Sequence, residues 1–343
     1  MNRIIQEDVE NILRADLAWE KLRGACVLVT GASGMLGGYL TRTFVQLNRS
    51  RNYGMKIYVL VRHPEKLAED LRSEVEVICQ NVAEPLKSSA EFDYVIHAAS
   101  PASPRIMKDD PVGTIAANTL GTFYTLEAAQ RSHAKGYLYI SSREIYGQPY
   151  ADQKVFTEDT YGFVDPLNPR SCYPEGKKAA ETMCASFRKQ YGLNVKIARL
   201  AHTFGPGMSI DDGRVQADFL RNVVHHEDIV LKSDGSAVRT YTYAGDAVKA
   251  LFYILLKSDD IVYNISSEAD TVSIRDLAQT LVDEFPERGL KLVFDIPKEK
   301  ADEGCAPFTL GILGSDKLKK LGWKPDYRLN EGLRRTVQYL ESE

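Results

Sequence analysis

The sequence predicts an α/β protein: a doubly wound parallel sheet with a smaller C-terminal α/β lobe. Residues 25–30 (ACVLVT) form a continuous apolar run, as expected for a strand that is buried on both faces. A glycine-rich turn and a helix follow directly. Strands and helices then alternate to about residue 200, which favours parallel strands joined by helices. Beyond residue 200 the alternation loosens, and we expect a smaller lobe interleaved with the last strands of the sheet.

The order of the elements follows from the spacing of apolar residues. A helix over residues 4–22 precedes the first strand and is expected to pack on the outside of the main domain. Further strands are predicted over residues 55–61, 75–81, 94–99, 137–142 and 194–200. Helices are predicted over residues 35–47, 111–132, 171–191, 245–256, 273–285 and 330–340, with irregular stretches over 148–170 and 286–314. The expected parts are an N-terminal helical extension (1–23), the main sheet domain (24–200) and the smaller lobe (201–343).

The composition is that of an ordinary globular protein: of 343 residues, 44% are hydrophobic and 26% are charged. The formal net charge of -4 gives no electrostatic reason to expect nucleic acid or an anionic membrane as a partner. No apolar run approaches the roughly 20 residues of a membrane span, and the charged N-terminus does not resemble a signal peptide. The five cysteines are scattered and lack CxxC spacing. We therefore expect reduced thiols in a cytoplasmic protein, with neither disulfides nor a metal site.

The turn after the first strand has the sequence GASGMLGG, in which Gly31, Gly34 and Gly37 are three residues apart. Glycine allows a tight turn and a close approach of the backbone to a ligand, and the dipole of the following helix attracts an anion. Because the turn stands between a strand and a helix, it predicts a cradle for the pyrophosphate of a dinucleotide. The residues expected to form the cradle are Gly31, Ser33, Gly34, Met35, Leu36 and Gly37.

The second strand ends without the acidic residue that usually binds the adenosine ribose of NAD. Val61 and Arg62 stand there instead. A cation suits the 2′-phosphate of NADP, but Arg62 could equally stack on the adenine of NAD, so the cofactor is left open as NAD(P)+. Further contacts to it are expected from residues at the ends of the third and fourth strands: Asn81, Val82, Ala98, Ala99 and Ser100.

A candidate reaction centre lies between Ser142, at the end of the strand over 137–142, and a YxxxK pattern, Tyr173 to Lys177. Residues four apart lie on the same face of a helix, so Tyr173 and Lys177 can point into one cleft with Ser142. An ammonium group next to a phenol favours the phenolate, which predicts a lowered pKa for Tyr173. Such a tyrosine can take the proton of a sugar hydroxyl while a hydride leaves the same carbon.

These motifs resemble the extended short-chain dehydrogenase/reductase family, the NAD-dependent epimerases and dehydratases of nucleotide sugars. The resemblance covers residues 27–340 and is closest to the UDP-glucuronate decarboxylases. It rests on the strings HAASPASP, SSREIYG, NPRSCYPEGKKAAETMC, TFGPGM, DGRV and RTYTYAGDAV. It implies a Rossmann-type fold, NAD as the cofactor that is usual in the family, and a nucleotide-sugar substrate. It also implies a homodimer formed by the helices over 111–132 and 171–191.

By position, the resemblance implies that Tyr173 is the base that helps to oxidise C4 of the sugar, with Lys177 on the nicotinamide ribose and Ser142 on the C4 oxygen. Glu144 matches the glutamate that decarboxylases and 4,6-dehydratases use after this oxidation. The residues assigned to the substrate are Ser100, Asn118, Arg143, His202, Arg214 and Arg239. The last two match residues that meet the diphosphate, where a guanidinium can bind two oxygens at once.

The chain also departs from the family pattern. Arg143 stands where dehydratases have an aspartic acid and decarboxylases a serine, His202 replaces an asparagine near the diphosphate, and Gly207 replaces an arginine. The stretch PFTLGILGSDKLKKLGW lacks the Arg-Lys-Pro of the decarboxylases. The nucleotide base and the sugar are therefore left open.

All candidate reactions begin with oxidation at C4 and differ in their second step. A carboxylate on C5 would leave as CO2, and an epimerase would return the hydride to the other face. Loss of water needs an acid, and Arg143 cannot give up its proton at neutral pH; it could pair with a substrate carboxylate or turn into solvent. We rank decarboxylation first, 4-epimerisation second and 4,6-dehydration third. A protein that only senses NAD(P) is the non-enzyme alternative, although Tyr173 and Lys177 argue against it.

Overall fold

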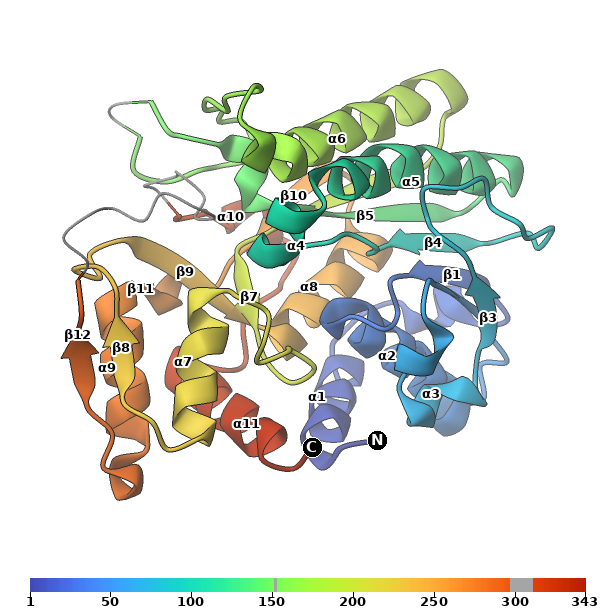
Figure 1. Cartoon of the computed structure of the whole chain (residues 1–343). Helices are drawn as coiled ribbons and strands as arrows, with labels where there is room; N and C mark the ends of the chain where they lie inside the picture. Colours follow the sequence, from blue (N-terminus) through green and yellow to red (C-terminus); the bar gives the residue numbers. More distant parts are fainter. Residues whose placement is uncertain (151–152, 297–310) are drawn as a thin grey trace.

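The computed structural model describes residues 1–150, 153–296 and 311–343. At its centre is a seven-stranded parallel sheet in the order β10-β6-β5-β4-β1-β2-β3 (Figure 1). The strands are β1 (Cys26–Thr30), β2 (Lys56–Val61), β3 (Glu76–Cys79), β4 (Tyr94–His97), β5 (Gly136–Ser142), β6 (Val195–Leu200) and β10 (Val262–Ile265). From β1 the chain first builds the sheet to one side and then, from β4, to the other. This order confirms the predicted doubly wound, Rossmann-type fold.

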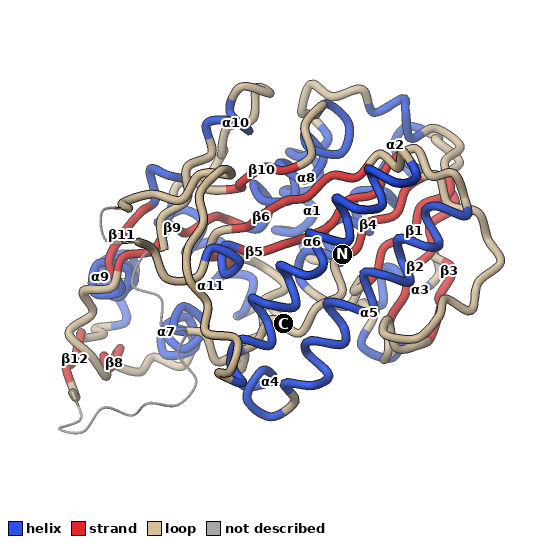
Figure 2. Tube along the Cα trace, turned by 90° about the horizontal axis from the view of Figure 1, so that it is seen from above, coloured by secondary structure: helices blue, strands red, loops and turns tan. Residues whose placement is uncertain are grey.

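Helices cover both faces of this sheet because its strands bury side chains on both sides. α5 (Pro111–Arg131) and α6 (Cys172–Tyr191) lie side by side on one face, as Figures 1 and 2 show. α2 (Met35–Arg51) and α8 (Ala244–Lys257) cover the other face. Successive residues of β1 belong to different hydrophobic cores, so the strand that leads into the glycine turn is held from both sides.

The smaller lobe has its own sheets and its own hydrophobic core. One sheet has the order β11-β9-β7, and β12 pairs with β8 in another. These strands are β7 (His202–Phe204), β8 (Ile229–Leu231), β9 (Val238–Tyr243), β11 (Thr271–Ser273) and β12 (Leu292–Phe294). The helices of the lobe are α7 (Val215–Val224), α9 (Ile274–Glu284) and α11 (Leu329–Leu340). Because α8 and β10 return to the large sheet, the chain passes between the two parts more than once.

The N-terminal segment differs from the single helix predicted over 4–22. α1 (Arg3–Leu13) ends after eleven residues, and a separate 3-10 turn covers Trp19–Leu22. The break lets the turn bury its apolar side chains: the Trp19 ring lies 5.0 Å from the ring of Phe252 in α8, between ring centroids. α1 itself packs against α2 and α8.

A buried carboxylate ties this segment to both parts of the molecule. Asp8 of α1 is 1% exposed, and its Oδ2 accepts hydrogen bonds from the hydroxyls of Tyr39 in α2 and Tyr243 in β9, each at 2.7 Å. Arg335 of α11 donates to its Oδ1, also at 2.7 Å. The extension is therefore part of the folded core and links the helix after the glycine turn to the lobe.

Other differences are local. The strand predicted over 94–99 ends at His97, because the backbone N–H groups of Ala98 and Ala99 donate to the hydroxyl of Thr30 at 3.1 and 3.0 Å. The short helices α3 (Glu69–Arg72), α4 (Pro104–Asp109) and α10 (Asp316–Lys319) were not predicted, and neither were β7, β11 and β12. β12 lies in the stretch that was predicted to be irregular, where its three residues form a strand because they pair with β8. Within the irregular stretches, residues 151–152 and 297–310 lie outside the described residues. No helix in the described ranges is long and apolar enough to cross a membrane.

Candidate active site

The glycine turn and the predicted reaction centre meet at one edge of the large sheet. Gly31 directly follows β1, and Ser142 is the last residue of β5. Both therefore lie at the carboxyl ends of parallel strands, close to the place where the strand order reverses. Open α/β sheets bind their ligands at this edge.

Gly31 and Gly37 stand at positions of the turn where a side chain would not fit. Gly31 has a φ of +73°, and a Cβ on it would lie 2.8 Å from Cα of Ala99. A Cβ on Gly37 would lie 2.2 Å from the carbonyl oxygen of Gly31. Gly34 is the N-cap of α2 and provides no side-chain cap, so the first N–H groups of the helix are free to bind an anion. The turn is thus shaped as an anion cradle.

The residues between these glycines differ in exposure. Ser33 is exposed, whereas Met35 and Leu36 are partly buried against the hydrophobic core of the sheet. The backbone of the turn is therefore the part that a pyrophosphate can approach.

The other residues predicted at the cofactor lie around this turn. Arg62 is exposed directly after β2, and its side chain makes no hydrogen bond or ion pair with another described residue. The side chain of Asn81 accepts a hydrogen bond from the N–H of Ala83 at 3.1 Å. Val82 is buried against α5, next to Gly121. A contact from Val82 to a cofactor would therefore come from its backbone.

Ser142, Tyr173 and Lys177 lie together at the end of β5. Tyr173 is buried in the first turn of α6, and the side chain of Ser142 is close enough to its phenol to lower the pKa of that phenol. Lys177 follows one helical turn later. Its Nζ donates to the carbonyl oxygen of Ile140 at 2.6 Å and lies 5.7 Å from the centroid of the Tyr173 ring. This is the arrangement that the YxxxK spacing predicts.

The predicted lowering of the Tyr173 pKa by Lys177 is wrong for this structure. Burial raises the pKa of Tyr173 to about 12, and the negative charge of Glu144 adds to the rise, whereas the hydrogen bond with Ser142 opposes it. Burial also lowers the pKa of Lys177 to about 7, against the opposing charge of Glu181. A lysine that loses its proton this easily is a weak source of positive charge for the phenol.

Glu144 is paired with Arg170, a residue that the sequence interpretation did not assign. Oε1 of Glu144 accepts a hydrogen bond from Nη2 of Arg170 at 3.0 Å, and the two side chains are 17% and 13% exposed. Oε2 of Glu144 and both Nε and Nη1 of Arg170 are buried without a hydrogen-bond partner in the described part of the chain. A signal for Arg170 was present, since it stands three residues before Tyr173 in the string NPRSCY.

Further arginines surround His202 on the side of the lobe. Burial and the positive charges of Arg143, Arg239 and Arg214 hold the pKa of His202 well below its usual range. Arg143 is 4% exposed, so it does not turn into solvent, and burial lowers its pKa to about 10. Arg214 pairs with Asp212, with Nη2 and Oδ2 2.9 Å apart. The structure therefore brings together the charged residues that were predicted at the substrate.

Asn118 does not face the cleft in the way that was predicted. It is fully buried, and its Oδ1 accepts a hydrogen bond from the hydroxyl of Ser100 at 2.9 Å. Its Nδ2 donates to the carbonyl oxygen of Thr114 at 2.9 Å, within α5. Both ends of the amide are thus used inside the protein, and Asn118 holds Ser100 in place and has no surface to offer a substrate.

Residues 27–266 match the family model described as the NAD dependent epimerase/dehydratase family. The chain belongs to this family. It is 32% identical to UDP-glucuronic acid decarboxylase 6 of Arabidopsis thaliana over 313 residues, which cover 90% of this chain and 86% of that protein. The epimerase/dehydratase family comprises NAD-dependent enzymes that modify nucleotide sugars.

Solved structures of the epimerase/dehydratase fold are also similar. The UDP-glucose 4-epimerase of Thermotoga maritima with UDP-glucose has a TM-score of 0.78 at 24% identity, over 92% of this chain and 99% of that chain. The UDP-glucuronic acid 4-epimerase of Bacillus cereus in complex with UDP-glucuronic acid and NAD has a TM-score of 0.74 at 18% identity, over the same shares of 92% and 99%. At these identities the likeness shows the fold alone.

The residues present fit the NAD of the epimerase/dehydratase family. Gly31 and Gly37 lack a Cβ where the backbone packs too tightly to accept one, and the N-terminus of α2 has no side-chain cap, which suits a pyrophosphate. Ala98 and Ala99 place a strip of small side chains beside the turn. These groups would hold the dinucleotide, with its nicotinamide end toward Tyr173 and Lys177.

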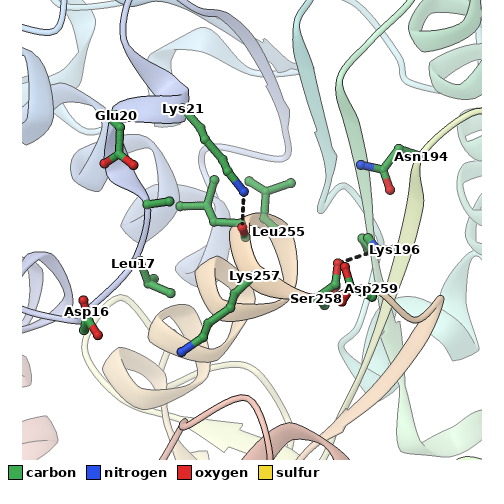
Figure 3. Close-up of a pocket in the computed structure, with 12 residues that line it drawn as sticks. Asp16, Leu17, Glu20, Lys21, Asn194, Lys196, Leu255, Lys257, Ser258 and Asp259 are labelled. Carbon is green, nitrogen blue, oxygen red and sulfur yellow. Dashed lines mark hydrogen bonds between the residues drawn. The ribbon is translucent and has the colours of Figure 1, made fainter.

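A cavity of about 800 Å³ lies elsewhere, at the amino ends of β6 and β10 (Figure 3). There Nζ of Lys21 donates to the carbonyl oxygen of Leu256 at 2.9 Å. Nζ of Lys196 donates to those of Ser258 and Asp260 at 2.8 and 3.2 Å. Both lysines therefore bind carbonyl groups at and beyond the end of α8. Among the described residues that line this cavity there is no tyrosine and no residue of the glycine turn, so we take the carboxyl edge as the candidate active site.

Proposed function

We propose that this protein oxidises C4 of a UDP-uronate and then releases the C5 carboxylate as CO2. The observation that carries the proposal is the charged pair Glu144–Arg170 next to Ser142 and Tyr173, whose side chains act on each other. Ser142 and Tyr173 act on the C4 hydroxyl, and Glu144 and Arg170 act on the group attached to C5. The similarity to a UDP-glucuronic acid decarboxylase over 90% of the chain supports this choice of substrate.

The first step belongs to Tyr173 and Ser142. Once ionised, Tyr173 takes the proton of the C4 hydroxyl, while Ser142 holds the C4 oxygen by a hydrogen bond. When bound, NAD(P)+ would supply the acceptor for the hydride of C4 and the source of its return. Lys177, anchored on the carbonyl of Ile140, positions this end of the cofactor.

The second step depends on the ketone at C4, because the C5 carboxylate is then part of a β-keto acid. The bond between C5 and the carboxylate carbon breaks, CO2 leaves, and the bonding electrons move into the C4 carbonyl. The hydroxyls of Ser142 and Tyr173 stabilise the negative charge on the C4 oxygen. Glu144 passes a proton to C5, and return of the hydride to C4 then completes the pentose.

Arg143 argues against loss of water as the second step. Elimination needs an acid beside the C6 hydroxyl, and a guanidinium with a pKa of about 10 keeps its proton at neutral pH. Arg143 is therefore unsuited to be the acid that elimination of water requires.

The second candidate is 4-epimerisation, which needs Tyr173, Ser142 and the cofactor alone. Incubation with UDP-, CDP-, GDP- and dTDP-linked sugars, followed by mass spectrometry and NMR, separates the candidates. Loss of the mass of CO2 from a uronate supports decarboxylation, and unchanged mass with inversion at C4 supports epimerisation. No product and no reduced nicotinamide with any sugar would contradict both and favour a sensing protein.

For the cofactor, we infer that Arg62 allows NADP to bind as well as NAD. It is exposed at the end of β2, where no acidic residue repels a 2′-phosphate. Replacing Arg62 with Ala should weaken NADP about tenfold, by loss of one charge-assisted hydrogen bond, and change NAD less than about twofold. Calorimetric titration with each dinucleotide measures this. Equal losses for both would mean that Arg62 stacks on adenine.

We also propose a homodimer through α5 and α6. The outer face of α5 exposes apolar side chains, namely Val112 (75%), Leu120 (45%) and Phe123 (38%). Such a row on one helix suits an interface better than solvent. Sedimentation equilibrium should give a two-chain mass, and replacing Leu120 and Phe123 with Glu should give a folded monomer. A monomeric wild type would contradict the proposal.

A further inference from the structure

The ion pair between Arg170 and Glu144 leaves hydrogen-bonding groups unused. Glu144 takes only Nη2 of Arg170, while Nε and Nη1 are buried without a partner among the described residues. Oε2 of Glu144 is in the same condition. A buried donor without an acceptor costs free energy, so such groups are rare in folded proteins and often mark a place where a ligand binds.

Arg170 is held in a fixed position next to the reaction centre. It lies in the 3-10 turn Pro169–Ser171, directly before α6, and the side chain of Asn168 accepts the N–H of Arg170 at 2.9 Å. The first turn of α6 carries Tyr173, and the charge of Arg170 acts on both Tyr173 and Arg143. The guanidinium of Arg170 is therefore near enough to Tyr173 for its charge to act on the phenol that would receive the C4 proton.

We propose that Arg170 binds the carboxylate of a uronate substrate and so selects uronates over neutral hexoses. This inference rests on the proposed function, because it needs Tyr173 to hold C4. The carboxylate on C5 is adjacent to C4 and accepts a hydrogen bond from Nε or Nη1, while Glu144 keeps Nη2. The hydroxymethyl group of a hexose offers only a neutral acceptor, which makes a weaker hydrogen bond to a guanidinium.

Binding of UDP-glucuronic acid and UDP-glucose to the NAD-loaded protein tests the proposal. The titrations use the Tyr173→Phe variant as parent, so that neither ligand is converted. We expect the parent to prefer UDP-glucuronic acid by about tenfold or more, and Arg170→Gln to abolish this preference by weakening UDP-glucuronic acid alone. A parent that binds both ligands equally, or an Arg170→Gln variant that weakens both equally, overturns the proposal.

Two further variants sharpen the result. Glu144→Gln keeps the shape of the pair but removes the negative charge that competes for Arg170, so UDP-glucuronic acid should bind as tightly as to the parent or more tightly. Arg143→Gln should keep the preference for UDP-glucuronic acid. If Arg143→Gln loses this preference while Arg170→Gln keeps it, the carboxylate binds to Arg143 and the proposal is overturned. If Arg170→Gln does not fold, Arg170→Lys keeps the charge and should reduce the preference only in part.

Failure of this inference is distinct from failure of the proposed function. Conversion of either sugar by Tyr173→Phe would contradict the role of Tyr173 in catalysis, whatever the affinities are. Equal affinities without conversion would leave that role intact and reject Arg170 as the residue that selects uronates.

Discussion

Two largely buried Arg–Glu pairs contact α6, and they are built in different ways. In one, Nε of Arg199 lies 3.1 and 3.2 Å from the two oxygens of Glu181, and Nη2 lies 2.7 Å from Oε2. Nη1 of Arg199 donates to the hydroxyl of Tyr146 and to the carbonyl oxygen of Glu158, each at 2.9 Å. The hydroxyl of Ser141 also donates to Glu181. This pair joins β5, β6 and α6 through several hydrogen bonds.

The pair of Arg170 and Glu144 is almost as deeply buried but is held by a single hydrogen bond. Its side chains are 13% and 17% exposed, against 10% and 12% for Arg199 and Glu181. Because the burial is so similar, solvent does not explain the difference. All the N–H groups of Arg199 that are described above have hydrogen-bond acceptors, whereas Nε and Nη1 of Arg170 have none among the described residues. We infer that the substrate supplies the missing acceptor.

The largest effect is expected at Tyr173, which lies next to the incomplete pair. Replacing Tyr173 with Phe removes the group that takes the C4 proton, and turnover should fall by about 10²–10⁴-fold. The affinity for NAD should change little, since the glycine turn is untouched. Steady-state turnover and calorimetric titration with NAD measure the two quantities. Wild-type turnover in this variant would show that another group is the base.

Replacing Glu144 and Glu181 in turn with glutamine tests whether the two pairs have different roles. Glutamine at position 144 still offers the one oxygen that Arg170 uses, whereas glutamine at position 181 offers one oxygen where Arg199 uses two. Glu181→Gln should therefore cost about 3–5 kcal/mol in the free energy of unfolding, and Glu144→Gln at most about 1 kcal/mol. Turnover should show the reverse order, with a loss of about 10²-fold or more for Glu144→Gln. Urea unfolding and turnover measure both, and equal stability losses would mean that both pairs are structural.

The parts of the site that depend on local pattern could be predicted from the sequence. Gly31 and Gly37 were found because a turn between a buried strand and a helix needs glycine, and Tyr173 and Lys177 because a helix aligns residues four apart. The doubly wound order was predicted in the same way, from the alternation of strands and helices. Each of these rules uses neighbours along the chain.

The residues that were missed depend on contacts between distant segments. The pairing of Arg170 with Glu144, 26 residues away, cannot be read from spacing, and neither can the burial that raises the pKa of Tyr173. Asn118 was placed at the substrate because of its position, but its amide is used inside α5 and by Ser100. Tertiary packing decided each of these outcomes.

The smallest effect concerns Lys177, whose charge is influenced by Glu181 of the first pair. Its folded pKa of about 7 lies below its ordinary value of 10.5, mainly because of burial, with Glu181 and Cys184 opposing the shift. Between about pH 7 and pH 10.5 the unfolded chain thus binds more protons than the folded chain at this residue. The contribution of Lys177 to the free energy of unfolding therefore rises with pH across this range. Below about pH 7 Lys177 is protonated in both states, so the full cost of burying its charge is present.

Two variants of the Arg199–Glu181 pair should shift the pH range over which stability rises, in opposite directions. Glu181→Gln removes a negative charge, so Lys177 should titrate at lower pH and the rise in stability should begin earlier. Arg199→Met leaves Glu181 with Lys177 as its remaining cation, so the rise should begin later, each shift being roughly one pH unit. The free energy of urea unfolding, measured from acid to alkaline pH, shows the two shifts. Loss of packing alone would lower stability by the same amount at every pH, so opposite shifts require that Glu181 and Arg199 set the charge of Lys177.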